Sequence, residues 1–305
     1  MEDKEEVFKI LKHCYDNGLR TFDTADAYSN GRSERLLGEF LRHYKINRET
    51  VVILSKIHFP VDESLELSLG ALYNPDEATA LTLSNQKGLS RKHIIDGVAK
   101  SVERLGTYID VLQIHRLDHE TPMEEIMKAL NDVVEKGQTR YIGASSMLAT
   151  EFAELQFVAE KHNWFKFISS QSCYNLLYRE DERELIPFAK RHNIGLTPWS
   201  PNAMGLLTRP LGSKTARYEA NSYLHDTPPE DQEIIRRVEE VAKKRDTTMA
   251  IVSIAWVLSK GCNPIVGLSS TGRVDEALKA IEFKLTEEES KYLEEPYRPK
   301  PLNPM

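Results

Sequence analysis

A regular alternation of strand-like and helix-like segments is the feature that most limits what this chain can fold into. Short apolar runs, such as Val-Val-Ile-Leu at 51–54, alternate with stretches whose apolar residues recur at helical spacing, as in 123–134. Runs that are apolar on both sides are typical of a parallel sheet covered on both faces. The alternation therefore predicts an α/β fold with a parallel sheet, open or closed.

Seven strands can be placed along the sequence, and helical patterns separate them. The predicted strands are 19–23, 51–54, 109–114, 141–144, 167–170, 195–198 and 264–267. With 305 residues, this count favours a closed TIM-type (β/α)8 barrel. The count is one strand short and the sequence opens on a helical pattern at 7–15, so we expect the barrel to be incomplete at its first strand. We expect a single barrel domain over 1–305.

Two long segments, 57–90 and 202–229, interrupt the alternation. Both follow strands, at the end where a barrel carries its active site, and long loops in compact domains are commonly functional. We expect the first to be an insertion loop that shapes the pocket and the second to be a cofactor and substrate loop. The C-terminal tail, 286–305, ends in a proline-rich stretch that favours an extended conformation.

The composition narrows the class of protein. A net charge of -7 gives no electrostatic footprint for general nucleic-acid binding. No apolar run approaches the roughly 18 residues of a membrane span, and the acidic N-terminus does not resemble a signal peptide. Three widely spaced cysteines indicate reduced thiols. We expect a cytoplasmic protein that acts on a small molecule, with an oligomeric state that the sequence leaves open.

Polar residues at three predicted strand ends are the candidates for catalysis. They are Asp23 and Tyr28, then Lys56, then His115. A tyrosine is a weak acid at neutral pH, and a lysine ammonium beside it stabilises the phenolate. An aspartate supplies the counter-charge that a buried lysine needs, and a histidine can hydrogen-bond a substrate oxygen. Together these groups can protonate a carbonyl oxygen while hydride arrives from elsewhere.

Each of these residues alone has a simpler interpretation. Asp23 before a threonine fits a turn or a cap, Tyr28 a rim aromatic and Lys56 a surface lysine. Their joint appearance at strand ends favours the catalytic interpretation. His115 and His119 are four residues apart, but they span a strand end and a loop without a carboxylate-rich set, so we predict no metal site.

The segments that carry these residues resemble the aldo-keto reductase superfamily. FDTADAY at 22–28 is similar to its first signature, ILSK at 53–56 to its lysine strand, and QIHRLD at 113–118 to its histidine strand. The resemblance, nearest to fungal-type members, extends to about residue 285. It implies a catalytic tetrad of Asp23, Tyr28, Lys56 and His115 and an NADPH-dependent reduction of aldehydes or ketones. The family's usual N-terminal hairpin and first strand have no counterpart here.

Further segments resemble the family's contacts with a nicotinamide cofactor. Ser145, Ser146 and Gln171 match residues that hold the carboxamide. Trp199 matches the aromatic that stacks on the nicotinamide ring, and Ser200 a phosphate contact. The other implied cofactor-binding positions are Asn202, Gly205, Arg217, Gly267, Leu268, Ser269, Arg273 and Glu276. Two positions depart from the family pattern: Asn202 in SPNAMG, where SPLA is usual, and Ala277, where an asparagine is common.

The segment around Ser269 also makes physical sense as an anion site. Ser269, Ser270 and Thr271 precede a predicted helix, whose first N–H groups are free to bind a phosphate. Arg273 adds a guanidinium fork, which favours NADPH over NADH. An ordinary helix cap beside a solvated arginine explains the same residues. No GxGxxG motif follows any predicted strand, so an ordinary dinucleotide fold is not indicated.

Two other functions are compatible with the same sequence. One is a cofactor-binding regulatory subunit with this fold and little turnover, since such subunits keep the tetrad. The other is a defective barrel that does not hold cofactor. Steady-state NADPH oxidation separates the first from a reductase, and tryptophan fluorescence titration with NADPH tests the second.

Overall fold

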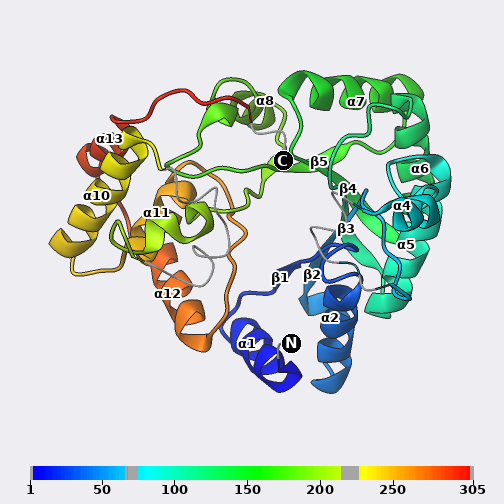
Figure 1. The fold of residues 1–305 in the computed structure, drawn as a ribbon, viewed down its shortest axis with the longest axis horizontal. Coiled ribbons are helices and arrows are strands. Elements are labelled where there is room, and N and C mark those ends of the chain that lie inside the picture. Colours follow the sequence, from blue (N-terminus) through cyan, green and yellow to red (C-terminus); the bar gives the residue numbers. More distant parts are fainter. Residues whose placement is uncertain (1–2, 66, 68–74, 214–226, 303–305) are drawn as a thin grey trace. The chain divides into compact units, whose positions relative to one another are not determined.

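The computed structural model describes residues 3–65, 67, 75–213 and 227–302. The chain divides into two compact units, Met1–Ser170 and Gln171–Met305. In Figure 1 the first unit runs from blue to green and the second from green to red.

The first unit is built on parallel strands in chain order. These are β1 (Thr21–Asp23), β2 (Val52–Ile57), β3 (Ile109–Ile114), β4 (Thr139–Ser145) and β5 (Phe167–Gln171), which follow one another in the sheet. β1, β2, β3 and β4 pair in parallel, with Asp23 opposite Leu54 and Lys56 opposite Gln113. The predicted α/β class with a parallel sheet is confirmed. The carboxyl ends of β1, β2 and β3 consequently lie at one edge.

Helices precede or connect these strands and lie along one side of them (Figure 1). They are α1 (Lys4–Asp16), α2 (Arg32–His43), α4 (Glu77–Leu83), α5 (Arg91–Leu105), α6 (Met123–Glu135) and α7 (Ala149–His162), with a short 3-10 turn at Arg48–Thr50. α2 packs on α5, α5 on α6 and α6 on α7. Over residues 3–20 the structure has α1 and no strand, which matches the predicted incomplete first strand.

Local capping explains where these helices begin. Ser90 Oγ accepts a hydrogen bond from His93 N at 3.2 Å and starts α5, which ends at Gly106 in the left-handed conformation. Asp76 Oδ1 accepts from Thr79 N at 2.8 Å and starts α4. The predicted insertion loop 57–90 therefore contains a helix that the sequence pattern did not indicate. α4 has only seven residues after the Asp76 cap. A segment this short does not show the apolar periodicity by which a longer helix is recognised in a sequence.

The second unit is mainly helical. It contains β6 (Gly195–Leu196) and the helices α8 (Leu185–Arg191), α10 (Pro229–Lys244), α11 (Met249–Ser259), α12 (Thr271–Glu282) and α13 (Glu287–Glu294), with 3-10 turns at Glu180–Glu182 and Ala203–Thr208. α11 packs on α10 and on α12. α13 occupies the start of the predicted tail 286–305, and no helix or strand follows over 297–302.

The predicted last strand, 264–267, is wrong as a strand. Ile265 forms only an isolated bridge with Trp199, and its N–H donates to Pro198 O at 2.8 Å. Proline has no N–H to donate to a ladder. Pro264 and Pro198 therefore keep the pairing from extending, and for the same reason β6 stops at Leu196, short of the predicted 195–198.

Candidate active site

Asp23 and Lys56 form the buried centre of the predicted tetrad. Lys56 Nζ donates to Asp23 Oδ2 at 2.6 Å and to the carbonyl oxygen of Thr24 at 2.8 Å. The two side chains are only 1% and 7% exposed, respectively. A lysine this deep needs a hydrogen-bonded counter-charge, which Asp23 supplies from the end of the neighbouring strand.

Tyr28 lies on the loop between β1 and α2. Its N–H donates to Ala25 O at 3.3 Å, and its carbonyl oxygen accepts from Ser33 N at 3.3 Å, so the loop turns back on itself here. The Tyr28 ring centroid is 4.9 Å from Lys56 Nζ. Tyr28 is 36% exposed, whereas Lys56 is covered. The partly exposed Tyr28 ring therefore lies next to the buried Lys56 ammonium.

His115 follows β3 and completes the cluster. Its N–H donates to Ile57 O at 3.0 Å, which continues the pairing of β2 and β3, and its ring meets that of Tyr28 edge-on at 5.7 Å. Burial, and then the positive charge of Lys56, lower the pKa of His115 to about 2. The imidazole is therefore neutral near pH 7, and it carries a single N–H.

Two further residues of this cluster were not among the predicted site residues. Gln113 Nε2 donates to Asp23 Oδ1 at 3.3 Å, so the second carboxylate oxygen is also bound. The Phe59 ring lies 5.0 Å from the His115 ring, in an edge-on arrangement. Gln113 pairs in register with Lys56, and this pairing is the signal that could have identified it. Phe59 lies in the predicted loop 57–90, where no periodicity places a side chain.

Ser145 is the last residue of β4 in the first unit, and Ser146 follows it directly. Their hydroxyl oxygens lie 3.2 Å apart, and Ser146 has a left-handed backbone with φ of 51°. Ser145 is buried, and both residues make further polar contacts. The structure thus presents two adjacent hydroxyl groups at a strand end.

The second unit holds the predicted residues Gln171, Trp199, Ser200, Asn202 and Gly205. Gln171 is buried at the end of β5. The Trp199 backbone is held by bridges to Cys173 and Ile265. Asn202 Oδ1 is buried and accepts no hydrogen bond in the described part of the chain. Gly205 has φ of 104°, which favours glycine, and a Cβ there would meet nothing within 4 Å. The segment 202–205 thus has open space beside Gly205 and an unsatisfied side-chain oxygen at Asn202.

The start of α12 carries the predicted anion site. Ser270 Oγ accepts from Arg273 N at 3.3 Å, and Arg273 Nη1 donates to Ser269 Oγ at 2.8 Å. Gly267 lies just before this turn, and a Cβ there would also meet open space. Leu268 instead packs on the core cluster of Ile251, Ile254, Ala277 and Ala280, so Ala277 is a packing residue.

Two predicted cofactor-binding residues, Glu276 and Arg217, and the histidine considered as a metal ligand, His119, remain to be placed. Glu276 accepts a hydrogen bond from Thr248 Oγ1, the residue that caps α11. Arg217 lies outside the described residues. His119 Nε2 lies 2.7 Å from Glu151 Oε1 on the surface. In the described ranges, no three His, Cys, Asp or Glu side chains gather as a metal site would need, and no helix has the length and apolar character to cross a membrane.

Comparison with known proteins identifies the class to which this fold and cluster belong. The model of the aldo/keto reductase family matches residues 2–298, so the chain belongs to that family. It is 68% identical over 304 residues to the Saccharomyces cerevisiae protein named "Putative aryl-alcohol dehydrogenase AAD16". The aligned stretch covers 98% of this chain and 88% of that protein. It is 50% identical over 313 residues to versiconal hemiacetal acetate reductase of Aspergillus parasiticus, covering 99% of this chain and 90% of the relative.

These relationships give the general chemistry. The chain is an oxidoreductase, and its family acts on small carbonyl substrates and generally uses NAD(P)H. The α/β fold predicted from the alternation of strands and helices is consistent with the barrel of that family, incomplete in this chain.

Proposed function

We propose that this protein reduces aldehydes or ketones to alcohols with NADPH, and that Tyr28 donates the proton. The observation that carries the proposal is the grouping of Asp23, Tyr28, Lys56 and His115 at one edge of the sheet. Lys56 Nζ lies 2.6 Å from Asp23 and 4.9 Å from the Tyr28 ring centroid, and the Tyr28 and His115 rings are 5.7 Å apart.

The nicotinamide, when bound, supplies hydride to the carbonyl carbon. The carbonyl oxygen then gains negative charge and needs a proton. The pKa of His115, held near 2 by burial, makes an imidazolium a poor candidate for the proton source. His115 instead offers its one N–H as a hydrogen bond to the oxygen. Tyr28 gives the proton, and the ammonium of Lys56 stabilises the phenolate that remains.

Several residues would hold the cofactor. Ser145, Ser146 and Gln171 have the donors and acceptors that a carboxamide needs, and Trp199 has a face for the ring. Ser269 and Arg273, at the N-terminus of α12, suit a phosphate dianion and favour NADPH over NADH. The open space at Gly205 and the unsatisfied Asn202 Oδ1 support a ligand along that loop.

We propose aromatic aldehydes as the substrate class. The rings of Phe59 and Tyr28 both lie in T-shaped arrangements with the His115 ring, at 5.0 and 5.7 Å, so the surface around the proposed oxygen-binding group is aromatic. Aromatic rings pair favourably in such arrangements. The names of fungal relatives, which include aryl-alcohol dehydrogenase, agree with this choice. We also propose a cytoplasmic location, on the basis of the three free cysteines, and a single barrel domain over 1–305.

Steady-state oxidation of NADPH with benzaldehyde and with a straight-chain aldehyde tests the function. We expect many turnovers per enzyme, faster with benzaldehyde at equal concentration. NADPH binding measured by tryptophan fluorescence, without multiple turnover on either aldehyde, would instead favour the regulatory subunit. Absence of NADPH binding would overturn the proposal at its cofactor step.

A further inference from the structure

The carbonyl oxygens along 198–201, in the second unit, each accept a hydrogen bond from another part of that unit. Pro198 O accepts from Ile265 N at 2.8 Å, and Trp199 O accepts from Tyr174 N at 3.3 Å. These first two donors are backbone groups. The donors that reach the next two carbonyls from other elements are buried side chains, so the backbone that follows Trp199 is fixed by particular residue types.

Asn175 holds the carbonyl of Ser200. Its Nδ2 donates to Ser200 O at 2.9 Å, and the residue is only 2% exposed. Its Oδ1 accepts from Leu177 N at 2.9 Å and from Tyr178 N at 3.1 Å, so the same side chain also closes the turn that follows it. The oxygen of the Asn175 amide therefore stabilises its own turn, whereas the nitrogen fixes Ser200.

Ser253 holds the carbonyl of Pro201 from α11. Its Oγ donates to Pro201 O at 2.7 Å, and the residue is buried. A serine in a helix commonly bonds back to the preceding turn, as Ser259 Oγ does to Trp256 O at 2.6 Å on the same helix. Ser253 instead bonds across 52 positions of the sequence. Its hydroxyl therefore supports the segment after Trp199 and not α11 itself.

The contact with Ser253 sets the direction of the Asn202 N–H. The peptide groups are trans, and the N–H of a planar trans peptide points away from the carbonyl oxygen of the same peptide. Because Pro201 O points to Ser253, the Asn202 N–H points away from α11, and among the described residues it has no acceptor. Asn202 Oδ1 is also buried without a partner there. Asn202 thus has a donor and an acceptor to offer to a ligand.

The backbone of this segment needs the support that it receives. Ser200 and Ala203 have φ of 55° and 45°, in the left-handed region that residues with a side chain adopt at a cost. Ala203 N donates to Ser200 O at 2.9 Å, so the chain turns tightly here. Loss of the donor at Asn175 or Ser253 would leave a carbonyl unsatisfied and would allow the strained turn to relax.

We propose that Asn175 and Ser253 are positioning residues for the nicotinamide cofactor. They fix the carbonyls of Ser200 and Pro201, and Asn202 is thereby held with its N–H available to a phosphate and its Oδ1 available to a ribose hydroxyl. The inference rests on the proposed function and adds two residues that act on the cofactor through the backbone.

Calorimetric titration of the protein with NADPH and with adenosine 2′,5′-bisphosphate tests the role of Ser253. The bisphosphate carries the 2′-phosphate proposed to bind at Ser269 and Arg273, and it lacks the nicotinamide half. We expect Ser253→Ala to weaken NADPH binding about three- to tenfold and to change bisphosphate affinity less than about twofold, because only the segment after Trp199 loses a donor. Ser259→Ala removes a hydroxyl from the same helix and should change neither affinity.

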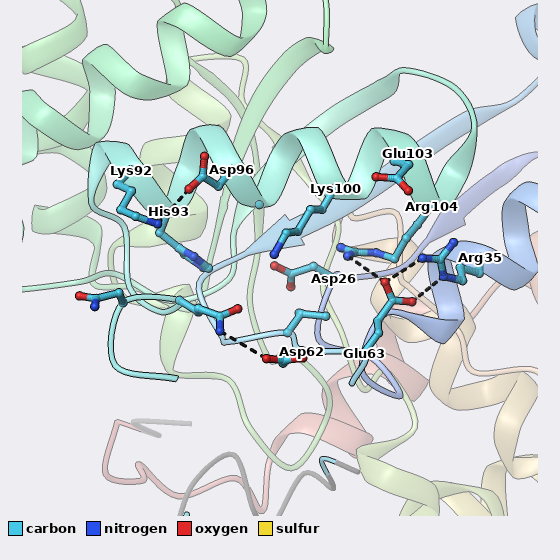
Figure 2. Close-up of a pocket in the computed structure, with 14 residues that line it drawn as sticks. Asp26, Arg35, Asp62, Glu63, Lys92, His93, Asp96, Lys100, Glu103 and Arg104 are labelled. Carbon is cyan, nitrogen blue, oxygen red and sulfur yellow. Dashed lines mark hydrogen bonds and ion pairs between the residues drawn. The ribbon is translucent and has the colours of Figure 1, made fainter. Parts of the chain in front are cut away.

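Asn175→Asp separates the two tasks of that side chain. A carboxylate still accepts from the two N–H groups of its turn, but it has no donor for Ser200 O. We expect NADPH binding to weaken at least about tenfold and bisphosphate affinity to stay within about threefold. Lys92→Gln is the charge control, because it changes the net charge by the same amount. It breaks the exposed ion pair with Asp96 on α5 (Figure 2) and should change neither affinity.

Two results would overturn the inference while the proposed function stands. They are unchanged NADPH affinity in both Ser253→Ala and Asn175→Asp, or equal weakening of NADPH and bisphosphate binding, which would show a general structural role. Retained bisphosphate binding also verifies that each variant is folded, and Ser253→Ala decides alone if Asn175→Asp does not fold. Absence of NADPH binding to the unaltered protein would overturn the proposed function, and this inference with it.

Discussion

The Lys56 ammonium lies 2.6 Å from the Asp23 carboxylate, and both side chains are buried beneath Tyr28, whose ring centroid is 4.9 Å from Lys56 Nζ. Asp23 also accepts from Gln113, and Lys56 also donates to Thr24 O. Removing two charges from water is costly unless their hydrogen bonds are satisfied. These contacts thus hold the Lys56 ammonium in one position next to Tyr28, which is the exposed side chain of the tetrad.

Replacing Tyr28 by phenylalanine removes the proposed proton donor and little else. We expect kcat to fall by about 10²–10⁴-fold, the usual contribution of a positioned acid, while NADPH affinity stays unchanged. Steady-state kinetics and fluorescence titration measure the two quantities. Tyr44→Phe is the matched control, because Tyr44 is equally exposed, at 36%, at the end of α2. A kcat preserved in Tyr28→Phe would rule out Tyr28 as the donor.

Breaking the buried ion pair should cost stability as well as activity. Lys56→Met leaves Asp23 charged and buried without its main partner, so we expect the free energy of unfolding to drop by about 3–5 kcal/mol. Lys92→Met breaks the exposed pair with Asp96 and should cost less than about 1 kcal/mol. Urea unfolding compares them. Adding Asp23→Asn to Lys56→Met should restore part of the loss, and equal losses in the two single lysine variants would contradict this account.

The tetrad could be predicted from the sequence because strand order and chain order coincide in the first unit. Asp23, Lys56 and His115 each follow a recognisable apolar run, and parallel pairing in register brings those ends together. The role of Gln113 follows from the same pairing, once its register with Lys56 is known.

Other parts of the structure have no comparable signal in the sequence. Phe59 reaches His115 from a long segment without periodicity, and α4 forms in that segment from a cap and seven residues. The strand predicted at 264–267 is limited to one bridge at Ile265, because its proline neighbours cannot extend a ladder. The buried ion pair of Glu34 and Arg104 spans 70 positions of the sequence, and no local pattern marks such a pair.

The buried histidines should make stability depend on pH. Burial lowers the pKa of His93 from 6.5 to about 4. The unfolded chain therefore binds this proton more readily, so the contribution of His93 is complete above pH 6.5 and is lost as pH falls toward 4. We expect His93→Gln to reduce the loss of unfolding free energy over this interval by up to about 3 kcal/mol. Urea unfolding at several pH values measures it. His162→Gln, at the exposed end of α7, should keep the slope of the unaltered protein, and a shared slope in both variants would refute the assignment.

Gly38 on α2 is a place where the usual effect of alanine in a helix should reverse. Alanine normally stabilises a helix interior relative to glycine by about 1 kcal/mol. A Cβ at Gly38, however, would lie 2.3 Å from the carbonyl oxygen of Leu105 and 2.9 Å from that of Arg104, both in the α5 backbone. Backbone atoms cannot rotate away, so the two helices must separate.

We therefore expect Gly38→Ala to lower the free energy of unfolding by about 1–3 kcal/mol, as overpacking does. Gly272→Ala in α12 is the matched control, because a Cβ there meets nothing within 4 Å, and it should be neutral or stabilising. Thermal and urea unfolding give both values. The separation of α2 from α5 would also strain the Glu34–Arg104 ion pair, which spans these helices. A stabilised Gly38→Ala protein would show that α2 and α5 are not packed as closely as the structure places them.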